Sequence, residues 1–160
     1  MRHVKKTIDL QKLNDFLGTC GPATKIYLGC DSKVLLTASR ERLAAYTTAI
    51  VVHIDGQHGG KLFYETVVEK DYSVSRNKPS PRLMTEVYKV SEMYLRILDE
   101  VENALDKDIE IHLDINPNKE HKSSAIVQEA LGYIQGTCQV LAKVKPESWA
   151  AMIVADKYVQ

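Results

Sequence analysis

The order of hydrophobic patterns along the chain constrains its fold more than any other feature. Three segments rich in Val, Ile, Thr, Tyr and Phe come first, and a cluster of turn-forming residues, "DGQHGG", separates the second from the third. Such segments are typical of strands, and a short turn between two of them predicts an antiparallel hairpin. The sequence therefore predicts a meander of three strands, at residues 25–33, 44–54 and 61–69.

Helical and strand patterns alternate after the meander. The longest helical pattern covers residues 81–106, where apolar side chains recur on one stripe and Pro81 suits the first turn. Strands joined through helices run parallel, with the helices on the faces of the sheet. We therefore expect an α/β fold with a mixed five-stranded sheet, in which the antiparallel meander continues into two parallel strands. The remaining strands and helices are expected at residues 108–116 (strand), 122–136 (helix), 138–144 (strand) and 146–158 (helix).

The size of the chain fits a single domain. The 160 residues, with a mass of 18.0 kDa, are enough for a substantial core. We expect one domain over residues 1–160, with residues 1–20 as a short N-terminal helical extension. In this extension, Thr7 is expected to cap a helix and Gly18 to end it.

Charge and cysteine content argue against several functional classes. Lys plus Arg and Asp plus Glu both number 21, so the chain is neutral and any contact with nucleic acid must come from local basic patches. The three cysteines are far apart and include no CxxC pair, which favours reduced thiols in the cytoplasm over a cysteine-based metal site. We expect no membrane contact, because no apolar run is long enough to span a bilayer and the first residues lack the apolar core of a signal peptide.

Two carboxylates stand near the ends of predicted strands. Asp31 closes the apolar run "IYLGC", and Asp114 lies near the end of "EIHLDIN". Taken alone, Asp31 is either a turn residue or a functional ligand at a strand end. Taken alone, Asp114 is either on the solvent-exposed face of an edge strand or part of a functional site. If the two strands are adjacent and parallel, the two carboxylates lie side by side. Glu110, at the start of the same stretch, is expected to be solvated.

Two further acids belong to predicted helices. Glu86 lies on the shoulder of the apolar stripe, where it can face the sheet, although an acid near a helix start also stabilises the helix dipole. Asp156 shares an apolar face with Trp149 and Ile153, and the alternatives are a frayed helix end or a pair with Lys157. Clustered carboxylates repel one another unless a cation compensates them, and oxygen ligands without cysteine suit Mg²⁺ or Mn²⁺.

The order of strands and helices resembles the ribonuclease H-like fold. The amino-acid sequence itself resembles, within that fold, the bacterial YkuK-type family. The stretches that carry this resemblance are "IYLGCDSK", "YTTAIVVH", "GGKLFYE", "RLMTEVY", "HLDIN" and "KPESWAAMIVADK". In this fold the metal-binding acids typically lie on the first strand, the first helix, the fourth strand and the last helix. The resemblance therefore implies a site for two Mg²⁺ or Mn²⁺ ions whose catalytic and metal-binding residues are Asp31, Glu86, Asp114 and Asp156.

The chain also departs from patterns known in the superfamily. The stretch "CDSK" lacks the Asp-x-Glu pattern of proofreading-type exonucleases, which argues against that branch. Asp156 falls two turns into its predicted helix rather than at its start. Lys33, beside the first acid, can occupy the cleft and mimic a cation.

The resemblance implies a function on nucleic acid. We expect a metal-dependent nuclease that hydrolyses phosphodiester bonds of RNA or DNA by a two-metal mechanism. The alternatives are a non-catalytic nucleic-acid-binding module on the same fold and a small-molecule phosphohydrolase. His121 can relay protons, although a solvated loop histidine is the simpler interpretation. Some residues are candidates for hydrogen bonds to the metal-binding side chains or for contacts with the substrate. They are Ser32, His112, Asn116, Arg76, Lys78, Arg82, Lys119 and Lys122.

Overall fold

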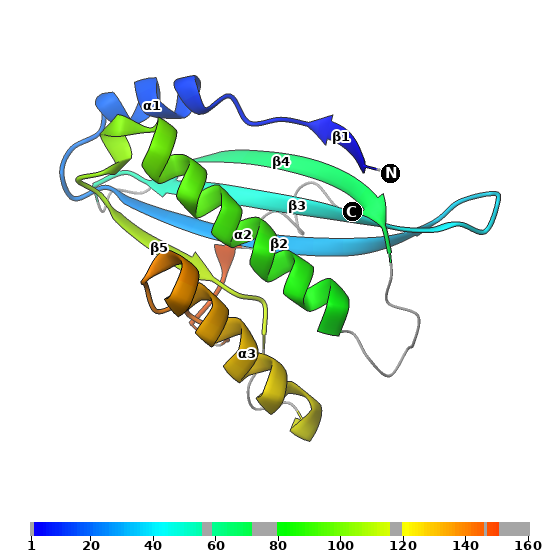
Figure 1. Ribbon diagram of the computed structural model, residues 1–160. Helices are drawn as coiled ribbons and strands as arrows, with labels where there is room; N and C mark the ends of the chain where they lie inside the picture. The colour runs from blue at the N-terminus through cyan, green and yellow to red at the C-terminus, as the bar shows by residue number, and fades with distance from the viewer. Residues whose placement is uncertain (1, 56–58, 72–79, 116–119, 146, 151–160) are drawn as a thin grey trace.

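A mixed β-sheet forms the centre of the protein (Figure 1). The computed structural model describes residues 2–55, 59–71, 80–115, 120–145 and 147–150. Within these residues the strands lie in the order β1-β4-β3-β2-β5. The strands are β1 (Arg2–Lys6), β2 (Lys25–Leu36), β3 (Arg42–His53), β4 (Gly60–Lys70) and β5 (Asp108–His112). The helices are α1 (Leu10–Gly18), α2 (Ser80–Glu100), the 3₁₀ helix η1 (Glu102–Ala104) and α3 (Glu120–Cys138).

The three long strands form the predicted meander. β2 pairs antiparallel with β3 from Lys25↔His53 to Leu36↔Arg42, and β3 pairs antiparallel with β4. Tyr, Thr, Ile and Val are frequent in β3, where branched and aromatic side chains pack well on the pleated surface. Arg40 adopts a positive φ of 62° in the turn between β2 and β3. The resulting hairpin extends beyond the other strands (Figure 1).

β5 adds a parallel strand to the other edge of β2. The pairs run from Lys25↔Asp108 to Gly29↔His112. β4 and β5 run in the same direction, so the chain between them must cross over, and α2 lies in this crossover. The strand that carries Asp31 and the strand before Asp114 are therefore adjacent and parallel, which was the condition for the two carboxylates to lie side by side.

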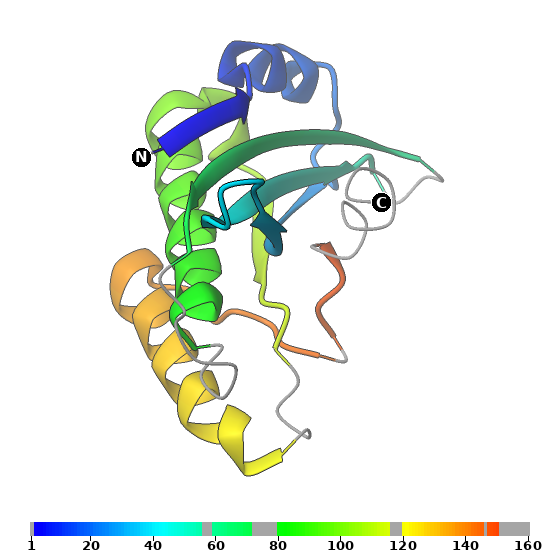
Figure 2. The ribbon, with the colours of Figure 1, turned by 90° about the vertical axis from the view of Figure 1, so that its right-hand side faces the viewer.

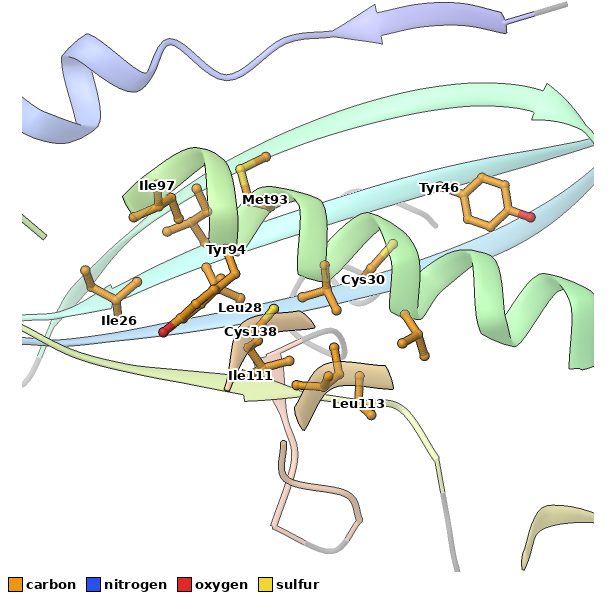
Figure 3. Close-up of a cluster of buried hydrophobic side chains, with 14 of the residues drawn as sticks. Ile26, Leu28, Cys30, Tyr46, Met93, Tyr94, Ile97, Ile111, Leu113 and Cys138 are labelled. Carbon is orange, nitrogen blue, oxygen red and sulfur yellow. The ribbon is translucent and has the colours of Figure 1, made fainter. Parts of the chain in front are cut away.

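α2 and α3 cover one face of the sheet. Figure 2 shows both helices on one side of the strands and residues 147–150 on the other side. The core between α2, α3 and the sheet includes Leu28, Ile97 and Ile111, which have no exposed surface (Figure 3). In the part of the chain that the structure describes, no helix is both long and apolar enough to cross a membrane.

The N-terminal region differs from the prediction. Residues 2–6 form strand β1, which pairs antiparallel with β4, where the sequence indicated no strand. This strand, "RHVKK", contains a single apolar residue, so it carries no hydrophobic alternation. The helix that follows is capped by Asp9 and not by Thr7, because Asp9 Oδ1 accepts the amide N–H of Gln11 at 3.0 Å.

The predicted strand at residues 138–144 is not confirmed as a strand. α3 continues to Cys138, which removes the first residue of that segment from any strand. A parallel bridge joins Lys143 to His112: the Lys143 N–H donates to the Ile111 carbonyl and the Lys143 carbonyl accepts the Leu113 N–H, both at 2.8 Å. Cys138, Val140, Ala142 and Val144 pack against the core, whereas Leu141 is exposed, and the predicted set of five strands is not confirmed.

Leu28 and Leu141 provide a matched test of the core. Leu28 is fully buried, whereas 79% of Leu141 is exposed. Leu28→Ala leaves a cavity under α2, and we expect it to lower the free energy of unfolding by about 2–5 kcal/mol. Leu141→Ala should change this energy by less than about 0.5 kcal/mol. Urea unfolding followed by circular dichroism measures both values, and equal losses would contradict the packing described.

Candidate functional site

The parallel pairing of β2 with β5 brings two carboxylates together. The last paired residues are Gly29 and His112, and Asp31 and Asp114 each lie two residues further along. Asp31 therefore lies inside β2, which continues to Leu36, and not at the end of its strand as the sequence indicated. Burial raises the pKa of Asp31, and the negative charge of Asp114 raises it further. The two acids are thus close enough to interact electrostatically.

α2 contributes a third acid, Glu86. This residue is 8% exposed, so the prediction that it faces the sheet is confirmed. Ser32 of β2 donates a hydrogen bond from its Oγ to Glu86 Oε2. Burial raises the pKa of Glu86 to about 8, the bond from Ser32 opposes this shift, and the charges of Asp31 and Asp114 add to it. At neutral pH, Glu86 is mostly protonated unless a cation stabilises its charge.

These three acids, which we call the acidic cluster, lie where β5 stops covering the edge of β2. Side chains alternate along β2, so Ser32 points to the face under α2 and Asp31 to the opposite face. Glu86 and Asp114 line one cavity of about 10 Å³ beside Cys30. This volume is room for about one water molecule. The cluster therefore combines groups from both faces at the part of the β2 edge that β5 leaves unpaired among the described residues, which we call the open edge.

Two basic side chains offset part of this negative charge. Lys145 Nζ lies 2.8 Å from Asp114 Oδ1. That oxygen is buried and has no hydrogen-bond partner among the described residues, so the contact is an ion pair without hydrogen-bond geometry. The positive charge of Arg82 lowers the pKa of Asp31 and Glu86, and Lys145 lowers that of Asp31. Both acids nevertheless keep a pKa above the ordinary value.

Comparison with known families adds an independent finding. Residues 10–160 match the family described as Ribonuclease H-like. The chain belongs to the ribonuclease H-like family. This is the YkuK-type family that the sequence resembles, so that resemblance is confirmed. Comparisons with curated proteins and with solved structures give no match.

Because metal-binding acids are typical of the ribonuclease H-like fold, the acidic cluster can be compared with the requirements of a metal ion. Its donors are carboxylate oxygens, which Mg²⁺ and Mn²⁺ prefer. The buried Oδ1 of Asp114 without a hydrogen bond, and the raised pKa of Asp31 and Glu86, are properties that a bound cation would relieve. The described residues contain no group of three His, Cys, Asp or Glu side chains close enough together to hold a metal ion. The donors therefore fit such an ion in chemistry but do not form a closed site among these residues.

The other predicted site residues divide into those the structure brings near the cluster and those it does not describe. Ser32 contacts Glu86 directly, and Arg82 interacts with two of the acids through its charge. The roles of the rest stay predictions, because the residues or their side chains lie outside the described part: Asp156, Asn116, Arg76, Lys78, Lys119, His121 and Lys122.

His112 is buried beneath other side chains. The residue is 1% exposed, and burial lowers its pKa, so its ring is neutral at pH 7. Glu110, which the sequence indicated to be solvated, has a side chain only 17% exposed and pairs with Lys143 at 3.1 Å. Tyr27 and Trp149 pack beside the histidine ring, and nothing in the sequence pattern indicated these contacts. Strand alternation assigns a side chain to a face but does not show what covers that face.

Glu86 should give the free energy of unfolding a pH dependence that a glutamine cannot. Its pKa is about 8 in the folded protein, against an ordinary value of 4.5. The folded state holds the proton more tightly, so this contribution to stability is fully present below pH 4.5 and is lost as the pH rises to about 8. In metal-free buffer, we expect the wild type to lose on the order of a few kcal/mol more than Glu86→Gln over this range.

Urea unfolding at a series of pH values measures this difference. Glu92→Gln is the matched control, because Glu92 lies exposed on the same helix. This variant should follow the wild-type curve. Parallel curves for the wild type and Glu86→Gln would show that the Glu86 carboxyl is not held as described.

Proposed function

We propose that the protein is a divalent-metal-dependent nuclease that hydrolyses phosphodiester bonds of RNA or DNA. One observation carries the proposal: in a chain of the ribonuclease H-like family, the charges of Asp31 and Asp114 raise the pKa of neighbouring acids at an open sheet edge. Carboxylates held together in this way repel one another and weaken the fold, so their clustering is typical of functional sites.

The acidic cluster would hold the metal. Asp31, Glu86 and Asp114 would bind two Mg²⁺ or Mn²⁺ ions, with Asp156 as the proposed fourth ligand. Bound ions of this kind supply Lewis acidity and an activated water for in-line displacement at phosphorus. Ser32 orients the Glu86 carboxyl through its hydrogen bond. Lys145 balances the charge of Asp114.

Arg82 is the described residue that we propose to contact a substrate phosphate. It lies on α2 one turn before Glu86, and its charge already acts on the acidic cluster. A cavity of about 200 Å³ beside it is also lined by Tyr46 and Thr85, whose hydroxyl groups can bind phosphate oxygens. Glu69 and Asp71 line the same cavity, and each forms an ion pair with a basic side chain, which reduces their repulsion of an anion.

A non-catalytic nucleic-acid-binding module is the second candidate function. The observation that favours it is the 2.8 Å contact of Lys145 Nζ with Asp114 Oδ1, because a cation of the protein itself then balances the charge that a metal ion would balance. The two candidates differ in one measurable property. A module binds nucleic acid without cleaving it, whichever metal is added.

A cleavage assay with site variants tests the proposed nuclease. The protein is incubated with labelled single-stranded, duplex, hybrid and branched nucleic acids in Mg²⁺, Mn²⁺ or EDTA. We expect cleavage only when a metal is present. Asp31→Asn and Asp114→Asn should each lower the rate on the order of 100-fold or more, because the loss of an ionised ligand removes several kcal/mol of transition-state stabilisation.

Asp99→Asn is the matched control for these variants. Asp99 is exposed on α2, so its loss should leave the cleavage rate unchanged. Cleavage that survives either substitution in the acidic cluster would exclude the proposed site. Salt-sensitive binding without cleavage of any substrate would favour the binding module.

Arg82→Gln should weaken nucleic-acid binding in a salt-dependent way. If Arg82 contacts one phosphate, the slope of log binding constant against log salt concentration should become shallower by about 1. Fluorescence anisotropy of a labelled oligonucleotide in EDTA measures binding without cleavage. Lys12→Gln is the control, since Lys12 is exposed on α1, which lies near the other end of α2 (Figure 1). Equal slopes for the wild type and Arg82→Gln would exclude this contact.

A further inference from the structure

A buried histidine joins the sheet to the segment that follows α3. His112 is the last residue of β5, and its ring centroid lies 5.3 Å from those of both Tyr27 and Trp149. The rings of Tyr27 and Trp149 also contact each other, with centroids 4.5 Å apart. This aromatic cluster of three residues lies on the face of the sheet that α2 does not cover, where Figure 2 shows residues 147–150.

Both ring nitrogens of His112 have partners. Nδ1 accepts the backbone N–H of Trp149 at 3.1 Å and that of Ala150 at 3.3 Å. Because both partners are donors, Nδ1 must carry the lone pair, and the hydrogen of the neutral ring lies on Nε2. Nε2 then donates to Glu110 Oε1 at 3.2 Å. The ring is therefore held in one tautomer and one orientation.

The partners of His112 are themselves held in place. Lys143 Nζ lies 3.1 Å from Glu110 Oε1, and Lys25 Nζ lies 3.7 Å from Glu110 Oε2. On the other side of the ring, Nδ1 is the acceptor for the backbone amides of two consecutive residues, Trp149 and Ala150, which is the kind of interaction that a side-chain cap makes.

We propose that His112 is a positioning residue that anchors the start of the C-terminal segment, Trp149 and Ala150, to the sheet beside Asp114. Its ring does not touch substrate, because both nitrogens are used within the protein. Asp156 follows Ala150 by six residues in the sequence, and Asp114 follows His112 by two. His112 thus ties the chain leading to one proposed ligand to the strand leading to another. This last step rests on the proposed function, and the anchoring does not.

Two substitutions separate anchoring from packing. His112→Asn keeps an acceptor near the position of Nδ1, because the amide oxygen of Asn is also bonded to Cγ. His112→Gln reaches towards Glu110 with its amide but has no polar atom at the Nδ1 position. Both variants lose the imidazole ring from the aromatic cluster, so both lose similar packing. The difference between them reports on the acceptor for the two backbone amides.

Hydrogen exchange is the direct measurement. Amide exchange at Trp149 and Ala150 should be about tenfold faster in His112→Gln than in His112→Asn, which corresponds to the loss of one capping interaction. The chain has one tryptophan, so its fluorescence reports on Trp149 alone, and its emission should shift to the red in His112→Gln. The kcat for cleavage should be about tenfold lower in His112→Gln than in His112→Asn, with similar KM.

Each outcome decides for or against the anchor. Equal exchange rates at Trp149 and Ala150 in the two variants would overturn it. Nitrogen NMR of the wild type needs no substitution, and it should show a hydrogen on Nε2 and none on Nδ1 of His112; the opposite tautomer would overturn the proposal. If the wild type cleaves no nucleic acid, the proposed function fails, while the exchange rates and the tautomer still test the anchor.

Discussion

The parallel pairing of β5 with β2 is the constraint on which the rest of the structure depends. It requires a crossover from β4, and α2 in that crossover brings Glu86 over Ser32. The same pairing places Asp114 beside Asp31. Because β5 is short, β2 continues beyond its last pair with β5, at Gly29, and the acids gather at this open edge. The fold and the candidate site therefore have one origin.

Burial and like charge act together at this edge. Burial is the larger cause of the raised pKa of Asp31 and Glu86, and neighbouring carboxylates add to it. Lys145 and Arg82 offset only part of the effect. A cation that bound the acidic cluster would remove much of this unfavourable energy, so binding and folding stability would be linked. On the opposite face, His112 binds the backbone of the C-terminal segment and connects it to the same edge.

The sequence predicted the elements whose signal is local. Branched and aromatic runs predicted the meander, and the apolar stripe predicted α2 with Glu86 turned towards the sheet. β1 has no such signal, since an edge strand with one apolar residue depends on backbone pairing with β4. The apolar residues at 138–144 indicated a strand; Val140, Ala142 and Val144 pack against the core, and a parallel bridge at Lys143 joins the segment to His112. The contacts of His112 with Trp149 and Ala150 join residues 37 and 38 positions apart, which no sequence period encodes.

Titration calorimetry with Mn²⁺ in buffers of different ionisation enthalpy tests the central claim most directly, because it measures metal binding and proton release together. Glu86 has a pKa of about 8, so it is mostly protonated at pH 7 and must lose its proton to bind a metal ion. Binding at pH 7 should therefore release about one proton per protein, and Glu86→Gln should release almost none. Absence of Mn²⁺ binding, or binding with the same proton release in Glu86→Gln, would contradict the account.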